Sequence, residues 1–193
     1  MSIEIREVGP EALKQYGEIP IRFRVDSVFR VEEVESGLGG LLLREAVLDQ
    51  PYTKDYGQSE GEGPLRWHGR FDLANWGFFL AYDGDRPVGA ATVAFRSPEA
   101  NMLEGRTDLA VLWDIRVHPH RRREGIGTRL FQRAVAWARE RDCSQLKVET
   151  QNVNVGACKF YASQGCRLGA IHRHAYQDPR VAGEAMLLWY LDL

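Results

Sequence analysis

Three arginines followed closely by two glycines, at residues 121–127, form a stretch suited to binding an anion. Glycine lacks a Cβ, so the backbone at Gly125 and Gly127 can approach an oxygen-rich ligand closely. If a helix starts there, its first N–H groups have no intrahelical acceptor and lie at the positive end of the helix dipole. The spacing predicts a site for an anion of pyrophosphate size or smaller, with a solvated basic loop as the alternative.

Other kinds of phosphate or polyanion site are disfavoured by the sequence. No Gly-Lys dipeptide occurs, which excludes a Walker A loop, and the glycines at 37–40 lack the third glycine and following helix of a dinucleotide site. The formal net charge is −2, and no basic stripe with interleaved aromatic residues occurs outside residues 121–123. We therefore expect no nucleic-acid partner.

Hydrophobic periodicity predicts the elements around the glycines. Residues 76–95 read as a β-hairpin that turns at 83–86, and residues 109–117 as the next strand. A helix is expected from Gly125 to about residue 140, because one face collects apolar side chains: Ile126, Leu130, Ala134, Trp137 and Ala138.

The flanking segments complete an α/β chain. After the helix we expect a strand at 145–150, a helix at 154–165 that ends at Gly165, and strands at 167–176 and 184–193. Before the hairpin we expect a strand at 3–8 and a short helix at 9–17. Strands follow within 21–48, of which the middle one, 27–35, could instead be helical, and then a long loop at 49–70.

Length and cysteine content predict one domain, residues 1–193, in a reducing compartment. Cys143, Cys158 and Cys166 are odd in number and show no C-x-x-C spacing, which is typical of free thiols and favours the cytoplasm. The first ten residues carry charge where a signal peptide needs an apolar run, and no eighteen-residue apolar segment occurs. We expect a soluble protein with no membrane partner.

Two motifs resemble those of a known family. Arg122-x-x-Gly125-x-Gly127, after a strand that ends Val117-x-Pro119, resembles the acyl-CoA signature of the GNAT N-acetyltransferase superfamily. Residues 154–165 resemble its second signature: an asparagine, an alanine three residues on, an aromatic-tyrosine pair and a glycine. Residues 149–176 and 183–193 are similar to the streptothricin (nourseothricin) acetyltransferase branch. The resemblance is strong from about residue 76 and weak before it.

The resemblance implies a fold and an activity. The fold would be a single GNAT-like α/β domain with a mixed, mostly antiparallel central sheet flanked by helices and splayed between its fourth and fifth strands to admit acetyl-CoA. Residues 76–193 would form the acetyl-CoA-binding core, and residues 1–75 the substrate side. The enzyme would transfer acetyl directly to a primary amine of a small cationic substrate, with a streptothricin-type antibiotic as the named candidate and antibiotic resistance as its purpose. A monomer and a homodimer stay open as alternatives.

The resemblance also implies roles for individual residues. Asp114 is our first choice of general base and Glu149 the second, because both should lie on neighbouring strands at the heart of the site. This branch usually shows two adjacent acids at this point, and here Trp113 replaces the first. Tyr161 would protonate the departing thiolate, with packing as its alternative. Trp113, Asp114 and Tyr176 would contact the substrate, and core burial is the alternative for Tyr176. The residues expected to bind the cofactor are Ile115, Arg116, Val117, Arg122, Arg123, Glu124, Gly125, Ile126, Gly127, Thr128, Asn154, Ala157, Phe160 and Tyr161.

Several alternatives compete with these roles. Asn154 could be an ordinary helix cap, and Cys158 packs in the core rather than attacking as a nucleophile. His118 with His120, and His172 with His174, have no acidic or thiolate ligand at a recognisable spacing, so we expect no metal cofactor. The acidic, glycine-rich residues 49–64 could close over a cationic substrate. A peptide N-terminal acetyltransferase and an acyl-CoA-binding module without chemistry remain competing hypotheses.

Overall fold

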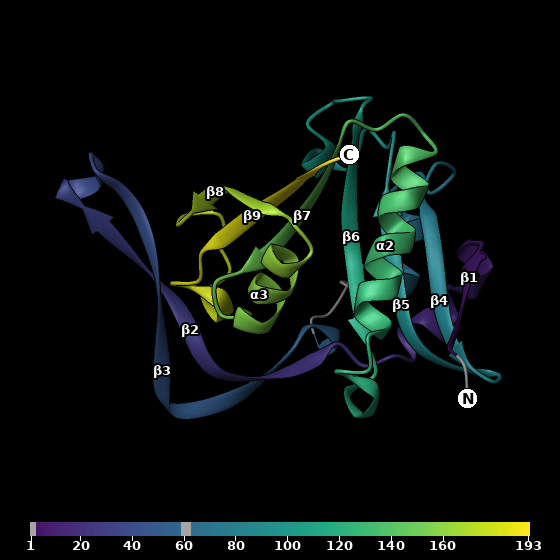
Figure 1. Cartoon of the computed structure of the whole chain (residues 1–193), viewed down its shortest axis with the longest axis horizontal. Coiled ribbons are helices and arrows are strands. Elements are labelled where there is room, and N and C mark those ends of the chain that lie inside the picture. The colour runs from purple at the N-terminus through teal and green to yellow at the C-terminus, as the bar shows by residue number, and fades with distance from the viewer. Residues whose placement is uncertain (1–2, 59–62) are drawn as a thin grey trace. The chain divides into compact units, whose positions relative to one another are not determined.

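The computed structural model describes residues 3–58 and 63–193. The described residues pack as two compact units, each made from separate stretches of chain. Unit 1 draws on residues 1–23, 55–147 and 192–193, and unit 2 on residues 24–54 and 148–191. Figure 1 labels the strands and the longer helices.

Unit 1 is built on four antiparallel strands in the order β1 (Ile3–Val8), β4 (Gly77–Asp83), β5 (Arg86–Ala94) and β6 (Leu109–Val117). The expected hairpin is confirmed, with β4 and β5 joined across Gly84 at φ 60°. Its apolar runs are buried along nearly their whole length. Strand β6 has the bounds expected from the sequence, so the chain enters the glycine-rich loop directly from a sheet.

Helix α2 (Ile126–Arg139) packs on this sheet with the apolar face expected from the sequence. Two glycines of the hairpin make room for it. A Cβ at Gly89 would lie 2.9 Å from Ile126 Cγ2, and a Cβ at Gly77 would lie 2.7 Å from Trp137 Cε2. The close approach of the helix backbone therefore depends on those two missing side chains, and it fixes where α2 begins.

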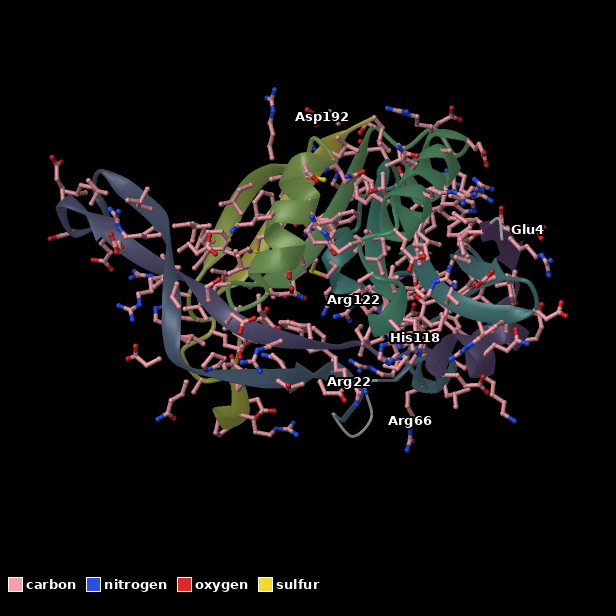
Figure 2. The ribbon with its side chains drawn as sticks, turned by 60° about the horizontal axis from the view of Figure 1, so that its bottom comes forward. Glu4, Arg22, Arg66, His118, Arg122 and Asp192 are labelled. Atoms are coloured by element: carbon pink, nitrogen blue, oxygen red, sulfur yellow. The ribbon has the colours of Figure 1, made fainter. Side chains whose placement is uncertain are left out.

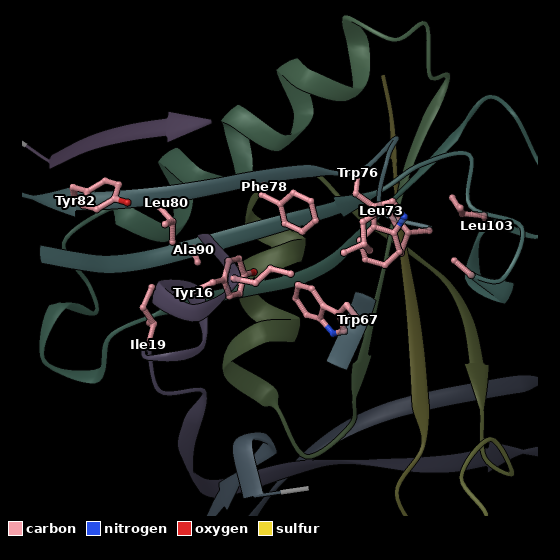
Figure 3. Close-up of a cluster of buried hydrophobic side chains, with 14 residues drawn as sticks. Tyr16, Ile19, Trp67, Leu73, Trp76, Phe78, Leu80, Tyr82, Ala90 and Leu103 are labelled. Atoms are coloured by element: carbon pink, nitrogen blue, oxygen red, sulfur yellow. The ribbon is translucent and has the colours of Figure 1, made fainter. Parts of the chain in front are cut away.

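A cluster of aromatic side chains forms a further part of the hydrophobic core of unit 1. Helix α1 (Leu13–Gly17) contributes Tyr16, and a 3-10 helix, η4 (Pro64–Gly69), contributes Trp67. Tyr16 and Trp67 are packed edge to face at 5.5 Å, and Trp67 contacts Trp76 at 6.2 Å (Figure 3). Burying each large apolar side chain contributes about 1.5–3 kcal/mol, so this cluster anchors the N-terminal segment to the sheet.

Unit 2 contains most of a two-stranded ribbon, which is formed by β2 (Arg22–Val34) and β3 (Gly40–Asp55) and labelled in Figure 1. The prediction of a loop over 49–70 is wrong for residues 49–55, which belong to β3. These residues are polar and show no apolar alternation, so the sequence gives no sign of a strand there. Pairing with β2 keeps their backbone extended. The helical alternative for 27–35 is also wrong, since β2 runs through it to Val34. Residues 59–62 of the expected loop lie outside the described residues.

The rest of unit 2 comprises the end of β7 (Gln145–Gln151), helix α3 (Val155–Ser163) and strands β9 (Met186–Asp192) and β8 (Arg167–His172). The strands run in the order β7, β9, β8. Gly165, at φ 89°, ends α3 as the sequence predicts. Strand β8 stops at His172, four residues earlier than expected, and the chain then turns. The remaining short 3-10 helices are η1 (Pro10–Ala12), η2 (Glu35–Gly37), η3 (Tyr56–Gln58), η5 (Asn101–Leu103), η6 (Pro119–Arg121) and η7 (Pro179–Val181).

These elements confirm the predicted α/β class with a mostly antiparallel sheet and flanking helices. The splay between the fourth and fifth strands, and the single domain over 1–193 with its division at residue 75, stay predictions. No helix in the described part of the chain is both long and apolar enough to cross a membrane.

Candidate active site

The glycine-rich loop leaves β6 and opens α2 as expected. After η6, Arg123 has φ 68° and Gly125 has φ 79°, so the chain passes twice through the left-handed region before the helix begins. Gly125 is the N-cap of α2 and supplies no side-chain capping bond. The space where its side chain would stand is open. The N–H groups of Ile126, Gly127 and Thr128 are thus in the first helical turn, where no intrahelical acceptor exists.

Two of the three arginines of this loop, Arg121 and Arg122, are bonded to the protein. Arg121 pairs with Asp83 and, at 2.9 Å, with Glu124. Arg122 donates from Nη2 to the carbonyl of Arg22 at 2.6 Å and from Nε to the carbonyl of Val117 at 3.2 Å. Figure 2 labels Arg22, His118 and Arg122 around this point. Both side chains therefore help to hold the loop in its conformation.

Asp114 on β6 is held by a buried arginine. Arg116 donates from Nε to Oδ1 at 2.9 Å and from Nη2 to Oδ2 at 2.5 Å. Tyr16 donates its hydroxyl to the same Oδ1 at 2.8 Å. The Arg116 side chain is 7% exposed and that of Asp114 10%. Burial, together with the Asp114 charge, raises the pKa of Tyr16 well above its usual range, so the phenol stays a donor.

The neighbours of Asp114 on β6 contact apolar groups or pair with β5. Trp113 packs against Phe71 with ring centroids 4.9 Å apart and against Trp76 at 5.2 Å. Ile115 pairs with Ala91 and Val117 with Gly89. Trp113 therefore extends the aromatic cluster, and a carboxylate at its place would lie against those rings.

In unit 2 a second carboxylate, Glu149 on β7, accepts a hydrogen bond from the hydroxyl of Tyr176. Burial raises the pKa of Glu149. The Tyr176 hydrogen bond and the positive charge of Lys54 oppose that rise, and the negative charge of Glu184 adds to it. Lys54 itself donates to both carboxylate oxygens of Glu184 at 2.5 Å.

Helix α3 carries the second predicted group. Asn154 caps it, because its Oδ1 accepts from the N–H of Ala157 at 3.1 Å, so the capping alternative is confirmed. Tyr161 is buried, at 5% exposed, and lies edge to face with Phe160 at 5.5 Å. Cys158 is 1% exposed, and burial raises the pKa of its thiol to about 12. It is a packed cysteine, as expected.

The histidine pairs bond locally. His118 Nδ1 accepts from the N–H of His120, and His172 Nδ1 accepts from the N–H of His174. Among the described residues, no three or more His, Cys, Asp or Glu side chains lie together as metal ligands would.

The match to known sequences agrees with both motifs. Residues 41–166, well over half of the 193, match the model of the acetyltransferase (GNAT) family. The chain belongs to the GNAT family. It is thus a GNAT acetyltransferase, and the resemblance in the glycine-rich loop and in α3 is confirmed at the level of family.

Individual GNAT relatives point to one branch. Streptothricin acetyltransferase A of Bacillus subtilis is 37% identical over 81 residues, 42% of this chain, and the match spans about half (47%) of that protein. Streptothricin acetyltransferase of Streptomyces lavendulae is 28% identical over 188 residues, covering 95% of this chain and 92% of the relative. The crystal structure of nourseothricin acetyltransferase has a TM-score of 0.79 at 26% identity and covers 100% of this chain and 99% of its own.

The structure groups the predicted GNAT site residues by unit. Trp113 to Val117 and Arg122 to Thr128 lie together in unit 1, on β6 and at the start of α2. Glu149, Asn154, Ala157, Phe160, Tyr161 and Tyr176 belong to unit 2. The two candidate bases are thus on different units. Their roles, and those of the cofactor residues, stay predictions.

Sequence reasoning missed four partners. Tyr16 bonds Asp114, and Lys54 pairs with Glu184 beside Glu149. The buried Asn152 donates to the carbonyl of Phe29 at 2.8 Å and accepts from the N–H of Ala185 at 2.8 Å. The pairing of Asp114 with Arg116, in contrast to these four, had a local signal in the sequence, because residues two apart on a strand share a face. The others join segments distant in sequence.

Proposed function

We propose that this enzyme transfers the acetyl group of acetyl-CoA to a primary amine of a small cationic substrate, and that a streptothricin-type antibiotic is its first candidate. The relatives named above support this choice, since the Streptomyces lavendulae relative spans nearly the whole chain. A cytoplasmic location belongs to the same proposal, as does a role in antibiotic resistance. The oligomeric state of the purified protein will distinguish a monomer from a homodimer.

The observation that carries the mechanism is the partly buried Glu149 carboxylate, which accepts a hydrogen bond from Tyr176. An alkyl ammonium of pKa about 10.4 is neutral in only about one molecule in 10³ at pH 7, so obtaining the free amine costs about 4–5 kcal/mol. Burial raises the pKa of Glu149, which brings its proton affinity closer to the operating pH, where a general base works best. Glu149 binds the ammonium as a carboxylate and accepts its proton.

Asp114 takes a different role in this proposal. The Arg116 guanidinium bonds both of its oxygens and Tyr16 bonds one of them, so its charge is already neutralised by a fixed partner. A substrate ammonium would have to displace a bidentate, buried arginine. We therefore propose Glu149 as the base and Asp114 as the residue that anchors β6 to the Tyr16 segment.

The start of α2 fits the pyrophosphate of acetyl-CoA. Its first turn has no side-chain cap, and a chain of N–H groups from Arg123 to Thr128 lies at the positive end of the helix. The backbone of Ile115 and Val117 would hold the pantetheine arm as an added strand. Asn154 caps α3 with its Oδ1, and its amide nitrogen has no acceptor among the described residues, which leaves a donor for the coenzyme.

Transfer is direct in this mechanism. The amine nitrogen attacks the thioester carbonyl, the C–S bond breaks, and the thiolate of coenzyme A takes a proton from Tyr161. The second proton that the nitrogen loses as the amide forms restores the Tyr161 phenol. Cys158 does not compete as a nucleophile, because a thiol with a pKa of about 12 is scarcely ionised near neutral pH. Tyr176 borders the amine in this proposal through its bond to Glu149.

The test is thiol release from acetyl-CoA with a panel of amines. Streptothricin should give the highest kcat/KM, above aminoglycosides, polyamines and short peptides. Turnover of peptides alone would select an N-terminal acetyltransferase instead. Thermal stabilisation by the coenzyme with no turnover of any amine would select a binding module without chemistry.

Tyr161→Phe tests the acid. General acid catalysis contributes about 10²–10⁴-fold, so kcat should fall by at least about 10²-fold while KM for acetyl-CoA changes little. Val155→Ala, at a buried position of the same helix outside the predicted site, is the matched control for packing. Unchanged kcat in Tyr161→Phe would remove Tyr161 from the mechanism.

A further inference from the structure

A buried ion pair lies beside Glu149 in unit 2. Lys54 comes from the end of β3 and Glu184 from the turn before β9, 130 positions apart in sequence. Lys54 Nζ bonds both oxygens of Glu184 at 2.5 Å, and each side chain is only 12% exposed. A pair this dry is costly to desolvate, and replacing such pairs by apolar groups is often neutral or stabilising. Stability alone is therefore a weak account of it.

The backbone fixes this pair next to the proposed base. Asn152, three residues after Glu149, bonds the backbone of Ala185 twice: its N–H donates to the carbonyl at 3.0 Å, and its Oδ1 accepts from the N–H at 2.8 Å. Ala185 directly follows Glu184. Tyr176, which donates to Glu149, lies in the same segment between β8 and β9 as Glu184. Both groups are thus held to the end of β7.

In the part of the chain that the structure describes, three groups act on the ionisation of Glu149. Two are charged, the cation of Lys54 and the anion of Glu184, and the third is the neutral phenol of Tyr176. Lys54 favours the carboxylate form of Glu149, and Glu184 disfavours it. Because the two are bonded to each other, their effects on Glu149 largely offset.

We infer that Lys54 and Glu184 act as a positioning pair that sets how readily Glu149 takes up the proton of the substrate amine. The inference rests on the proposed role of Glu149 as base. Lys54 alone would make Glu149 too weak a base. Glu184 alone would keep Glu149 protonated, because two carboxylates that share a site do not ionise together. The bonded pair leaves one net negative charge, which suits a single ammonium group.

The test is to follow the ionisation of Glu149 directly. Glutamate with a ¹³C-labelled carboxyl group is incorporated, the Glu149 signal is assigned by its loss in Glu149→Gln, and the signal is titrated by NMR. A nearby charge shifts a carboxyl pKa by about one unit or more. Glu184→Gln should move the titration of Glu149 down by about one unit and Lys54→Met up by about one unit. The double variant Lys54→Met/Glu184→Gln should return close to the parent.

A pair with a merely structural role would not shift the titration of Glu149 in opposite directions in the two single variants. Nor would it return that titration to the parent value in the double variant. Lys54→Arg keeps the charge and should titrate as the parent does. If Lys54→Met does not fold, Glu184→Gln and the double variant still carry the test. An unmoved Glu149 titration in Glu184→Gln would overturn the inference.

Kinetics separate this inference from the proposed function. The acidic limb of kcat/KM against pH should shift with the NMR titration in each variant. If Glu149→Gln keeps full turnover while the NMR shifts occur, Glu149 is not the base, and the pair sets only its ionisation. If Glu149→Gln is inactive and the titration does not move, the base is correct and the pair is not its regulator.

Discussion

Two carboxylates with similar partners have different availability in this protein. Asp114 in unit 1 and Glu149 in unit 2 each accept a hydrogen bond from a tyrosine, and each has a cation nearby. In unit 1 the cation, Arg116, is bonded to the carboxylate itself. In unit 2 the cation, Lys54, is bonded to a second carboxylate. The difference shows that the partner of the neighbouring cation, and not the presence of a cation, decides whether a carboxylate remains available to a substrate.

The largest expected effect comes from Glu149→Gln. Loss of a general base should lower kcat/KM by about 10²–10⁴-fold. The parent should lose activity as the pH falls through the raised pKa of Glu149, and this acidic limb should disappear in the variant. Steady-state kinetics over a range of pH measure both. If kcat/KM falls by less than about tenfold and the acidic limb is retained, another residue is the base.

The same variant has a stability signature of definite sign. The folded pKa of Glu149 lies above its unfolded value, so the native state binds more protons. Its contribution to the unfolding free energy is fully present below the ordinary pKa of glutamate and is lost as the pH rises through the folded value. Urea unfolding from acidic to neutral pH should show that slope in the parent and a smaller one in Glu149→Gln.

Asp114→Asn should affect stability more than chemistry. It leaves the buried guanidinium of Arg116 without its anion, which costs about 3–5 kcal/mol in measured cases. Urea unfolding at neutral pH should show this loss, with kcat of the folded fraction within about tenfold of the parent. Asp114→Leu with Arg116→Met removes both charges and should recover part of the stability. Loss of kcat comparable to that of Glu149→Gln would return Asp114 to the role of base.

Tyr176→Phe should have the smallest effect. The Tyr176 hydrogen bond lowers the pKa of Glu149, so its removal should raise that pKa and move the acidic limb of kcat/KM up by about one unit. The kcat on the alkaline side of the limb should change little. Tyr190→Phe on β9 is the control and should leave the limb in place. A limb that does not move in Tyr176→Phe would mean that the phenol does not tune Glu149.

The elements that sequence reasoning predicted well are those whose signal is local. Helix α2 and the β4–β5 hairpin follow from apolar spacing, and β6 ends before the predicted turn at Pro119. The end of β3 was missed because residues 49–55 are extended by a partner strand and not by their own pattern. The predicted strand at β8 was too long because Arg167 and His172 are similar in polarity to the residues that follow the strand.

The candidate site divides in the same way. The glycine-rich loop and the Asn154 cap are short motifs, so the sequence predicts their geometry. The ranking of Asp114 over Glu149 rested on position in a motif, which carries no information about which carboxylate an arginine has already bound. The neighbours that separate the two, Tyr16 and Lys54, come from distant segments, and only the folded chain brings them in.

The discontinuity of unit 2 has a consequence for biosynthesis. The β2–β3 ribbon leaves the ribosome well before its partners Asn152, Lys159, Arg173 and Glu184, which are all encoded after residue 147. At about 5–20 residues per second, translation of the intervening segment takes on the order of ten seconds. An isolated two-stranded ribbon is marginally stable in water, and this one exposes Leu38 and Val47. The nascent ribbon therefore waits for most of the chain to be made before its partners are available, and it needs protection during that time.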